Sequence, residues 1–401
     1  MSQPEIRSLF PIFDEHPDWV YLDSAASAQK PRSVIDALAN FYSKEYATVH
    51  RAIYQRSLAA TEKYEATRKT AARLLNAALP EEIVFTRGAT DGINLVAQSL
   101  GSSFKAGDEI IVSEIEHHSN LVPWQMLAAK TGLMLRIAPV LDDGSFDLEA
   151  FEKLLSEKTT LVCVTHMSNV TGSIFPIREI SRLCRKVGAK ILVDGAQAAA
   201  HLRVDVQDLD VDFYVFSGHK CYGPTGVGIL YGKQKWLEEM PPVQGGGDMV
   251  DKVYFEKSSY QKAPLKFEAG TPLIASVIAL KPALDLLMDL GLESIASWER
   301  QLYLAALEAV QKIPGIEIVG TSIDKGAILT FSIDGTHPLD IAFFLDLKNI
   351  SIRSGHLCAQ TALKRFGLQC AARASFGIYN TLEDVNLFAS ALSDVACSLR
   401  K

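Results

Sequence analysis

From about residue 83 the chain alternates short runs of apolar and β-branched residues with stretches that have helical periodicity. The apolar runs include IVFT, EIIVSEIE, LVCVTH, KILVD and DFYVFS, and helical stretches such as EISRLCRKVG lie between them. Strands that alternate with helices form a mostly parallel sheet with helices on both faces. The runs LVCV and ILV are apolar at every position, which is typical of parallel strands buried on both sides. The sequence therefore predicts an α/β fold.

This alternation stops between Gln244 and Thr271, where a glycine triplet, aromatic residues and charges show no amphipathic period. We expect an active-site loop or an inter-domain passage there. Beyond it, two long helical stretches precede the short strands GIEIVG and AILTFSI, and LEDVNLFASALSDVACSLR predicts a closing helix. We therefore expect an N-terminal segment at 1–20 that packs with the small domain, a large domain at 21–265 and a small α+β domain at 266–401.

The composition fits a globular protein and excludes several classes. A chain of 401 residues with 48% hydrophobic residues is long enough for a large domain and a smaller one. Its net charge of -7, with no basic run, argues against a nucleic-acid binder. The N-terminus lacks the features of a signal or transit peptide, and no segment approaches 18 uninterrupted apolar residues. We expect a cytoplasmic protein with no membrane partner.

Six cysteines are spread along the chain: Cys163, Cys184, Cys221, Cys358, Cys370 and Cys397. They form no CxxC pair, so the sequence predicts reduced thiols with neither a disulfide framework nor a metal site. Cys163, Cys184 and Cys397 lie in apolar or amphipathic runs, where a small buried residue suffices. Cys358 differs because its neighbours are polar.

Polar side chains follow the predicted strands at their carboxyl ends, where ligands bind in open parallel sheets. After IVFT comes a turn in which the N–H groups of Ala89 and Thr90 and the Thr90 hydroxyl are suited to hold a phosphate at the positive end of a helix. The later strand ends carry His117, His118, Asn120, Asn169, Asp194, Gln197 and Lys220. We expect these side chains to converge on one edge of the sheet.

Asp194 and Lys220 are the pair of residues that a pyridoxal cofactor requires. A carboxylate keeps the pyridine nitrogen protonated, an amine forms a Schiff base, and the ring then acts as an electron sink. Ser217 and His219 flank the lysine as candidate phosphate donors, and His117 is a candidate to stack on the ring. Each residue alone also fits an ordinary structural role, such as a helix cap or a surface charge. Their convergence favours pyridoxal phosphate.

A second group of polar residues lies in ISIRSGHLCAQTAL, where Arg353 and His356 precede Cys358. Cationic neighbours favour the thiolate form of a cysteine, which is the nucleophilic form. Arg373 follows in RASFGIYNT and is suited to bind a substrate carboxylate through two parallel hydrogen bonds. The structural alternatives are a buried helical cysteine and an ordinary surface salt bridge.

The ordered set of motifs resembles the group II cysteine desulfurases, the SufS/CsdA type also called selenocysteine lyases, within the class V aminotransferase family of fold type I. The matching stretches are YLDSAASAQKP, TVHRAIY, TRGATDGINLVAQ, EHHSNLVPWQ, MSNVTG, VDGAQAAAH, DFYVFSGHKCYGPTGVGILYGK, GGGDMV, FEAGTP, RSGHLCAQ and RASFGIYNT. They span nearly the whole chain. The resemblance implies a large domain with a mostly parallel seven-stranded sheet between helices, which binds pyridoxal 5'-phosphate, and a smaller α+β domain that carries the catalytic cysteine.

The resemblance also implies roles around the cofactor. Lys220 is expected to form the Schiff base, Asp194 to contact the pyridinium nitrogen and Gln197 the phenolic oxygen, with His117 stacked on the ring as a further catalytic residue. The residues expected to contact the phosphate are Thr90, Ser217, His219 and, from the other subunit of a homodimer, Thr271.

Around the substrate, the resemblance implies that Asn169 and Arg373 hold the carboxylate and that His50 and Arg353 line the pocket. Cys358 is expected to attack the sulfur of L-cysteine, which leaves L-alanine and a persulfide on Cys358. The short approach to Cys358 resembles group II enzymes, which usually pass sulfur to a small acceptor protein of the SufE/CsdE or SufU kind. Iron–sulfur cluster assembly or other sulfur trafficking would use such a persulfide.

Three positions depart from the pattern of the family. Leu357 and Tyr54 stand where many relatives have histidine, so pocket polarity and proton relays are expected to differ. Cys221 stands where relatives commonly carry an apolar residue. It is interpreted as a packing residue or, alternatively, as an oxidation-sensitive thiol near the cofactor.

Other activities on the same scaffold stay open at the level of sequence. They include a selenocysteine lyase, a kynureninase-like hydrolase and an epimerase, and those without sulfur chemistry have no need of Cys358. A non-enzymatic alternative is a sulfur-transfer scaffold that mainly binds an acceptor. Cysteine and selenocysteine differ by one atom, and no readable feature of the pocket separates them.

Overall fold

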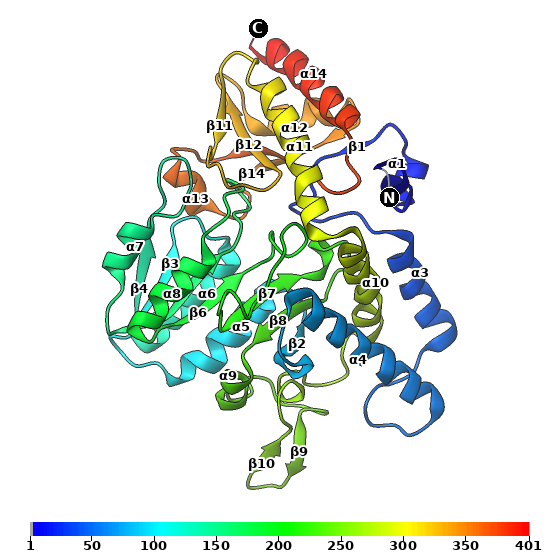
Figure 1. The fold of residues 1–401 in the computed structure, drawn as a ribbon, viewed down its shortest axis with the longest axis vertical. Helices are drawn as coiled ribbons and strands as arrows, with labels where there is room; N and C mark the ends of the chain where they lie inside the picture. The colour runs from blue at the N-terminus through cyan, green and yellow to red at the C-terminus, as the bar shows by residue number, and fades with distance from the viewer. Residues whose placement is uncertain (1–2, 401) are drawn as a thin grey trace.

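A computed structural model of the chain describes residues 3–400, and its largest element is a seven-stranded sheet (Figure 1). The strands lie in the order β2 (Ile83–Thr86), β8 (Gly228–Gly232), β7 (Phe213–Ser217), β6 (Lys190–Asp194), β5 (Thr159–Thr165), β3 (Glu109–Ser113) and β4 (Met134–Ala138). All neighbours from β7 to β4 are parallel, and β8 is antiparallel to β7 and β2. The predicted mostly parallel sheet is confirmed.

Helices cover both faces of this sheet. One face packs against α4 (Gln55–Leu75), α8 (Ile177–Val187) and α10 (Ile274–Leu290), and the other against α5 (Ala89–Ser99), α6 (Val122–Thr131) and α9 (Gln234–Glu239). Along β6, Ile191 and Val193 belong to the first apolar cluster while Leu192 belongs to the second. Alternate side chains of a strand point to opposite faces, so a strand buried on both sides has to be apolar throughout.

A smaller antiparallel sheet lies beyond the large one, at the top of Figure 1. Its strands run in the order β11 (Ile316–Val319), β12 (Ile328–Ile333), β15 (Ala371–Ser375) and β14 (Arg353–Gly355). The helices α11 (Leu292–Val310), α12 (Pro338–Asp346) and α14 (Leu382–Leu399) share an apolar cluster with it. The closing helix α14 was predicted, and Thr381 begins it with a capping box. Within residues 3–400, no helix combines the length and apolar character needed to cross a membrane.

The N-terminal segment contacts the part of the chain that contains the small sheet. Helix α1 (Gln3–Ser8) is followed by α2 (Ile12–Glu15), and the Gln3 amide donates to the carbonyls of Ile378 and Asn380 at 2.6 and 2.7 Å. Strand β1 (Val20–Tyr21) pairs in parallel with β13 (Ile350–Ser351). Helix α10 packs against α3 (Arg32–Asn40) and α4. The boundaries expected at residues 20 and 265 stay predictions.

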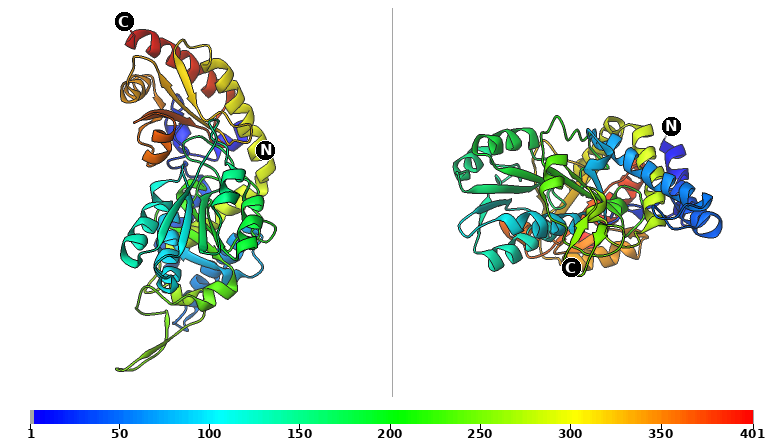
Figure 2. Two further views of the ribbon diagram at one scale, coloured as in Figure 1. Left: turned by 90° about the vertical axis from the view of Figure 1, so that its left-hand side faces the viewer. Right: turned by 90° about the horizontal axis from the view of Figure 1, so that it is seen from below.

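The segment from 244 to 271 contains an element that the sequence pattern did not predict. Strands β9 (Val250–Val253) and β10 (Ser258–Tyr260) form an antiparallel hairpin, followed by a single turn of 3-10 helix at Leu265–Phe267. The hairpin projects from the end of the molecule opposite the small sheet (Figure 2). Nearly all of its residues are exposed, and Phe255 at its tip is fully exposed. A hairpin without a buried face shows no alternation of apolar and polar residues, which explains why the pattern was missed.

Gly195, which follows β6 directly, packs closely against the ring of Tyr214. A Cβ atom at this position would overlap the buried ring of Tyr214. We predict that Gly195→Ala lowers the free energy of unfolding by about 3 kcal/mol, because the ring has no free space to move into. Chemical denaturation measures this change, with Gly245→Ala as the control.

A Cβ atom on Gly245 meets no other atom within 4 Å, so its substitution is expected to change stability by less than about 0.5 kcal/mol. Equal stability of the two variants would contradict the packing described for Gly195.

Candidate active site

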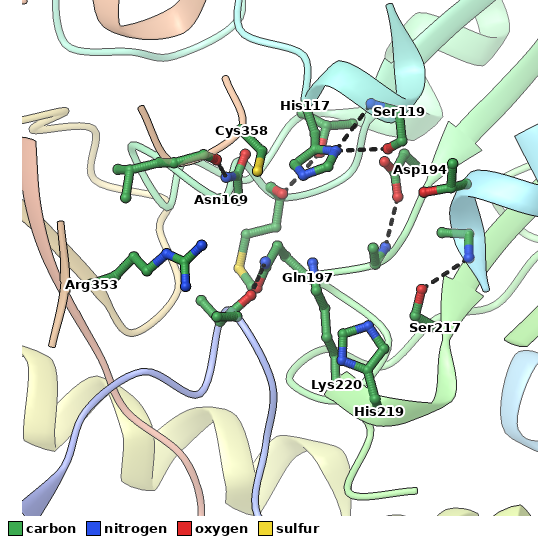
Figure 3. A pocket seen from close by; sticks show the side chains of 18 of the residues that line it. His117, Ser119, Asn169, Asp194, Gln197, Ser217, His219, Lys220, Arg353 and Cys358 are labelled. Atoms are coloured by element: carbon green, nitrogen blue, oxygen red, sulfur yellow. Dashed lines mark hydrogen bonds between the residues drawn. The ribbon is translucent and has the colours of Figure 1, made fainter. Parts of the chain in front are cut away.

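A cavity at the junction of the two sheets brings together most of the residues that the sequence predicted (Figure 3). Its lining includes Ala89, Thr90, His117, Asn169, Asp194, Gln197, Ser217, His219, Lys220, Arg353, Cys358 and Arg373. Figure 3 shows Cys358, Asn169 and Arg353 on one side of the cavity and Asp194 and Ser217 on the other. His50 and Thr271 lie outside this lining. Among residues 3–400, no group of three or more His, Cys, Asp or Glu side chains is arranged to hold a metal ion.

Asp194 is the last residue of β6, and its side chain is almost completely buried. One carboxylate oxygen accepts a hydrogen bond from the N–H of Ala196 at 2.9 Å. Burial raises the pKa of Asp194, and the Ala196 N–H and the charge of Lys220 both oppose that rise. The carboxylate is therefore a strong acceptor for a cationic or N–H-bearing group.

Lys220 ends a short 3-10 turn, Gly218–Lys220, that follows β7 directly. Since β6 and β7 are parallel neighbours, their carboxyl ends place Asp194 and Lys220 on the same edge of the sheet. Burial lowers the pKa of Lys220, and the negative charge of Asp194 partly opposes this. A lowered pKa increases the fraction of neutral amine, which is the form that attacks a carbonyl carbon.

His117 precedes the 3-10 turn His118–Asn120 after β3. Its Nδ1 accepts from the backbone N–H of Ser119 at 3.1 Å and lies 2.8 Å from the Ser119 hydroxyl oxygen. Burial, with a smaller effect of the Lys220 charge, lowers the pKa of His117 to about 3. The imidazole is therefore neutral and carries its proton on Nε2.

The amino end of α5 forms the opposite end of the cavity. The N–H of Ala89 donates to the hydroxyl oxygen of Ser217 at 2.9 Å. This close approach of α5 to β8 needs Gly228, because a Cβ there would lie 2.5 Å from the Cα of Gly88. The amino end of this helix, with the hydroxyls of Thr90 and Ser217, forms a site suited to a phosphate group.

These residues fit pyridoxal phosphate. The buried carboxylate of Asp194 matches a pyridinium nitrogen, the amine of Lys220 matches an aldehyde, and the amino end of α5 matches a phosphate. Gln197 donates its amide to the carbonyl oxygen of Ala25 at 2.8 Å, which fixes the side chain beside Asp194. The three chemical features of the cofactor each have a complementary group on this chain.

Arg373 lies in the middle of β15 and is 3% exposed. Its Nη1 donates to the backbone oxygen of Asn169 and its Nη2 to Asp23 Oδ1, both at 3.0 Å. Its buried Nε has no hydrogen-bond partner among residues 3–400. An unpaired buried N–H costs about 1–3 kcal/mol, so the site is suited to a ligand that accepts from it, such as a carboxylate. Arg353 Nη1 lies 4.0 Å from Asp23 Oδ2.

Cys358 lies on a short loop between β14 and α13 (Gln360–Arg365), and its side chain is exposed. Two hydrogen bonds from residues that follow β5 and β3 of the large sheet hold this loop. The amide of Asn169 donates to the carbonyl oxygen of Leu357 at 2.7 Å, and the backbone N–H of His118 donates to that of Cys358 at 2.8 Å. Asn169 therefore orients the cysteine loop in addition to any contact with substrate.

The three positions that depart from the family pattern differ in how exposed their side chains are. Leu357 is 5% exposed and belongs to the main apolar cluster, which explains an apolar side chain there. Tyr54 is half exposed at the start of α4. Cys221 is fully buried, and burial raises its pKa to about 12. This environment favours packing over the oxidation-sensitive alternative, because the thiolate is the form that is oxidised.

Cys163 and Cys184 are buried, as expected, whereas Cys397 is exposed and the expectation of a buried residue there was wrong. An amphipathic period does not distinguish the edge of the apolar face of α14 from its centre.

Two residues predicted for the site lie elsewhere in the structure. His50 Nε2 lies 3.1 Å from Glu65 Oε1, and the ring packs edge-on against Tyr64. Thr271 is exposed, three residues after Glu268, which pairs with the buried Arg68 at 2.7 Å. The roles assigned to His50 and Thr271 stay predictions.

Sequence reasoning assigned no role to Asp23 or Glu116. Asp23 accepts a hydrogen bond from Arg373. The acidic residue in the stretch YLDSAAS was the only sign in the sequence that could have indicated this role. Glu116 is fully buried and accepts from the Asn120 amide and the Thr165 N–H at 2.7 and 2.8 Å. Burial raises the pKa of Glu116 to about 8. An acid next to paired histidines was visible in the sequence, but its burial was not.

The comparison with protein families identifies the class of this protein. The family described as Aminotransferase class-V matches residues 20–388. Because this is most of the chain, the chain belongs to the class V aminotransferase family, and its cofactor is pyridoxal phosphate.

Relatives place the chain among the cysteine desulfurases. A cysteine desulfurase from Escherichia coli (strain SE11) is 47% identical over 399 residues, which cover 98% of both chains. A cysteine desulfurase from Synechococcus elongatus is 46% identical over 392 residues, which are 97% of this chain. The match spans 63% of that relative, less than two thirds of its length. The crystal structure of the S-sulfonic acid form of CsdA from E. coli matches with a TM-score of 0.94 and 41% identity, over 100% of this chain and 99% of that one. The predicted fold type I architecture is confirmed.

Lys220 is the group expected to bind the cofactor covalently. We predict that borohydride reduction of the loaded protein fixes the cofactor to the peptide containing Lys220, and that Lys220→Ala abolishes this fixation. Mass spectrometry of the digested protein gives the position. Lys266→Ala serves as a matched control, because Lys266 is also buried but donates to the carbonyl oxygen of Glu238. Fixation to another lysine in the wild-type protein would contradict the assignment.

Proposed function

We propose that this chain is a pyridoxal-phosphate-dependent cysteine desulfurase in which Cys358 takes the sulfur of L-cysteine as a persulfide and L-alanine is released. One observation supports this proposal most directly. A cavity that contains a matched set of groups for the cofactor is also lined by the exposed thiol of Cys358 and by Arg373, whose buried Nε has no hydrogen-bond partner within residues 3–400.

The cofactor supplies, when bound, an electron-withdrawing ring that stabilises negative charge on the α-carbon of an amino acid. Asp194 favours the protonated ring nitrogen because its buried carboxylate needs a positive partner. Lys220 holds the cofactor, and its amine with a lowered pKa is suited to accept the α-proton of the substrate. The neutral ring of His117, fixed by Ser119, keeps a proton at Nε2 available inside the cavity.

Arg373 is the proposed binding group for the substrate carboxylate. Its Nε has no hydrogen-bond partner in the described part of the chain, and the bonds from Nη1 to Asn169 and from Nη2 to Asp23 fix the plane of the guanidinium group. A carboxylate bound at this edge restores the missing hydrogen bond. The bound substrate then lies between Lys220 and the cysteine loop, because Arg373, Lys220 and Cys358 line the same cavity.

Cys358 performs the sulfur transfer in this proposal. Its thiolate attacks the sulfur of the substrate, so that an S–S bond forms while the Cβ–S bond of the substrate breaks. The electron pair of the broken bond remains with the substrate carbon, which takes up a proton and becomes the methyl group of alanine. L-cysteine and one enzyme thiol thus give L-alanine and one enzyme persulfide, with no external oxidant or reductant.

A persulfide on an exposed loop needs an acceptor. We propose a small acceptor protein of the SufE/CsdE or SufU kind, because Cys358 is exposed and, among the described residues, is the one cysteine in the lining of the cavity. The homodimer and the cytoplasmic location belong to the same proposal. Preference for cysteine over selenocysteine is decided by comparing the two substrates with and without an acceptor.

Cys358→Ala tests the nucleophile. We predict that this variant keeps the yellow colour of the bound cofactor but loses persulfide and sulfide formation from L-cysteine by at least about a hundredfold, because a nucleophile that forms a covalent intermediate has no substitute. Sulfide release after addition of a reductant is the measurement. Cys397→Ala is the control, since Cys397 is also exposed but lies on α14, outside the cavity.

Full activity of the Cys358→Ala protein would overturn the assignment and would favour a class V chemistry that needs no thiol. Binding of an acceptor without any turnover by the wild-type protein would favour a sulfur-transfer scaffold.

A further inference from the structure

The loop that carries Cys358 has an unusual backbone. Leu357 and Cys358 are consecutive residues with φ angles of +53°, in the left-handed region. Each such residue other than glycine costs about 1–3 kcal/mol when the surroundings hold it there. The strained pair turns the side chain of Leu357 into the apolar cluster and leaves that of Cys358 exposed. The position of the thiol therefore depends on contacts that hold this conformation.

His118 contacts the loop on both sides of the thiol. Its backbone N–H donates to the carbonyl oxygen of Cys358 at 2.8 Å, and its Nε2 accepts from the backbone N–H of Gln360, the first residue of α13, at 3.1 Å. Asn169 holds the preceding carbonyl, that of Leu357. These contacts join the large sheet to the cysteine loop, and His118 supplies two of them.

The contact to Gln360 requires one form of the imidazole. A backbone N–H can only donate, so Nε2 of His118 must carry a lone pair, and the proton of the neutral ring is on Nδ1. The charge of His356, which lies in the loop, acts on this ring, and the ring of His117 lies 6.2 Å away between centroids. Burial and His356 lower the pKa of His118, so the ring is neutral at pH 7.

We propose that His118 is a positioning residue that holds the Cys358 loop in the conformation for sulfur transfer. Its Nε2 does so by accepting a hydrogen bond from the N–H of Gln360. This inference rests on the proposed function of Cys358. His118 acts through the loop and not on the cofactor or the substrate. A protonated imidazole has no lone pair at Nε2, so it cannot accept the Gln360 N–H. The hydrogen bond is therefore fully formed well above the ordinary pKa of a histidine, about 6.5. It is lost as the pH falls through the lowered pKa of His118.

The test compares His118→Gln with His118→Leu in the loaded protein at pH 7. The side-chain oxygen of glutamine can accept from Gln360, whereas leucine has a similar size but no acceptor. We expect His118→Leu to slow formation of the Cys358 persulfide by about tenfold, the effect of one lost hydrogen bond. We expect His118→Gln to keep the rate within about threefold and both variants to keep the absorbance of the bound cofactor.

Hydrogen exchange of the Gln360 amide provides a second measurement, which does not depend on turnover. In the wild-type protein we expect protection of this amide, corrected for the intrinsic exchange rate, to decrease as the pH falls below about 6.5. The His118→Gln protein should keep its protection over that range, because an amide oxygen does not titrate there. The His118→Leu protein should lack protection at every pH.

Equal persulfide formation in His118→Leu and the wild type would overturn the proposal. Equal loss in both variants would also overturn it, since it would assign the imidazole a role that an acceptor cannot replace. If the wild-type protein forms no persulfide at all, the proposed function fails, and the exchange measurement still decides whether His118 holds the loop.

Discussion

Asp194 ends the central strand β6 with its carboxylate almost completely buried, and a charge at that depth has to be compensated. Removal of an ion from water costs several kcal/mol even after the protein relaxes. The Ala196 N–H and the nearby Lys220 supply part of the compensation, and in our proposal the protonated ring nitrogen of the bound cofactor would supply the rest. The remainder of the cavity is arranged around this one group. Lys220 follows the adjacent parallel strand, and the amino end of α5 lies opposite, where a phosphate would reach it.

The proposed binding of the substrate carboxylate and the proposed sulfur transfer depend on how the smaller sheet is placed against the larger one. Cys358 and Arg373 come from the loop after β14 and from β15, whereas Asn169 and His118 come from the loops after β5 and β3. Asn169 holds Arg373 through its backbone oxygen and the cysteine loop through its amide, at 3.0 and 2.7 Å. The backbone and the side chain of Asn169 therefore link the proposed carboxylate-binding residue, Arg373, to the loop that carries the proposed nucleophile, Cys358. A shift of the smaller sheet would move both together.

Much of this arrangement could be predicted from sequence, for a physical reason. The carboxyl ends of parallel strands meet at one edge, so recognition of the strands before Asp194 and Lys220 was sufficient to place the two residues together. Cys358 was distinguished by its polar neighbours. The contact between His118 and Gln360, and the pairing of Asp23 with Arg373, join residues more than 200 positions apart, and no local pattern contains that information. The exposed hairpin of β9 and β10 was missed because neither of its faces is buried.

The central claim is that Cys358 takes sulfur directly from a substrate bound at the cofactor. Peptide mass spectrometry of the loaded wild-type protein after a single exposure to L-cysteine labelled with heavy sulfur tests this most directly. We expect one heavy sulfur atom on the peptide that contains Cys358, together with one equivalent of alanine. Alanine formed without labelled Cys358, or label on another cysteine such as Cys370, would contradict it.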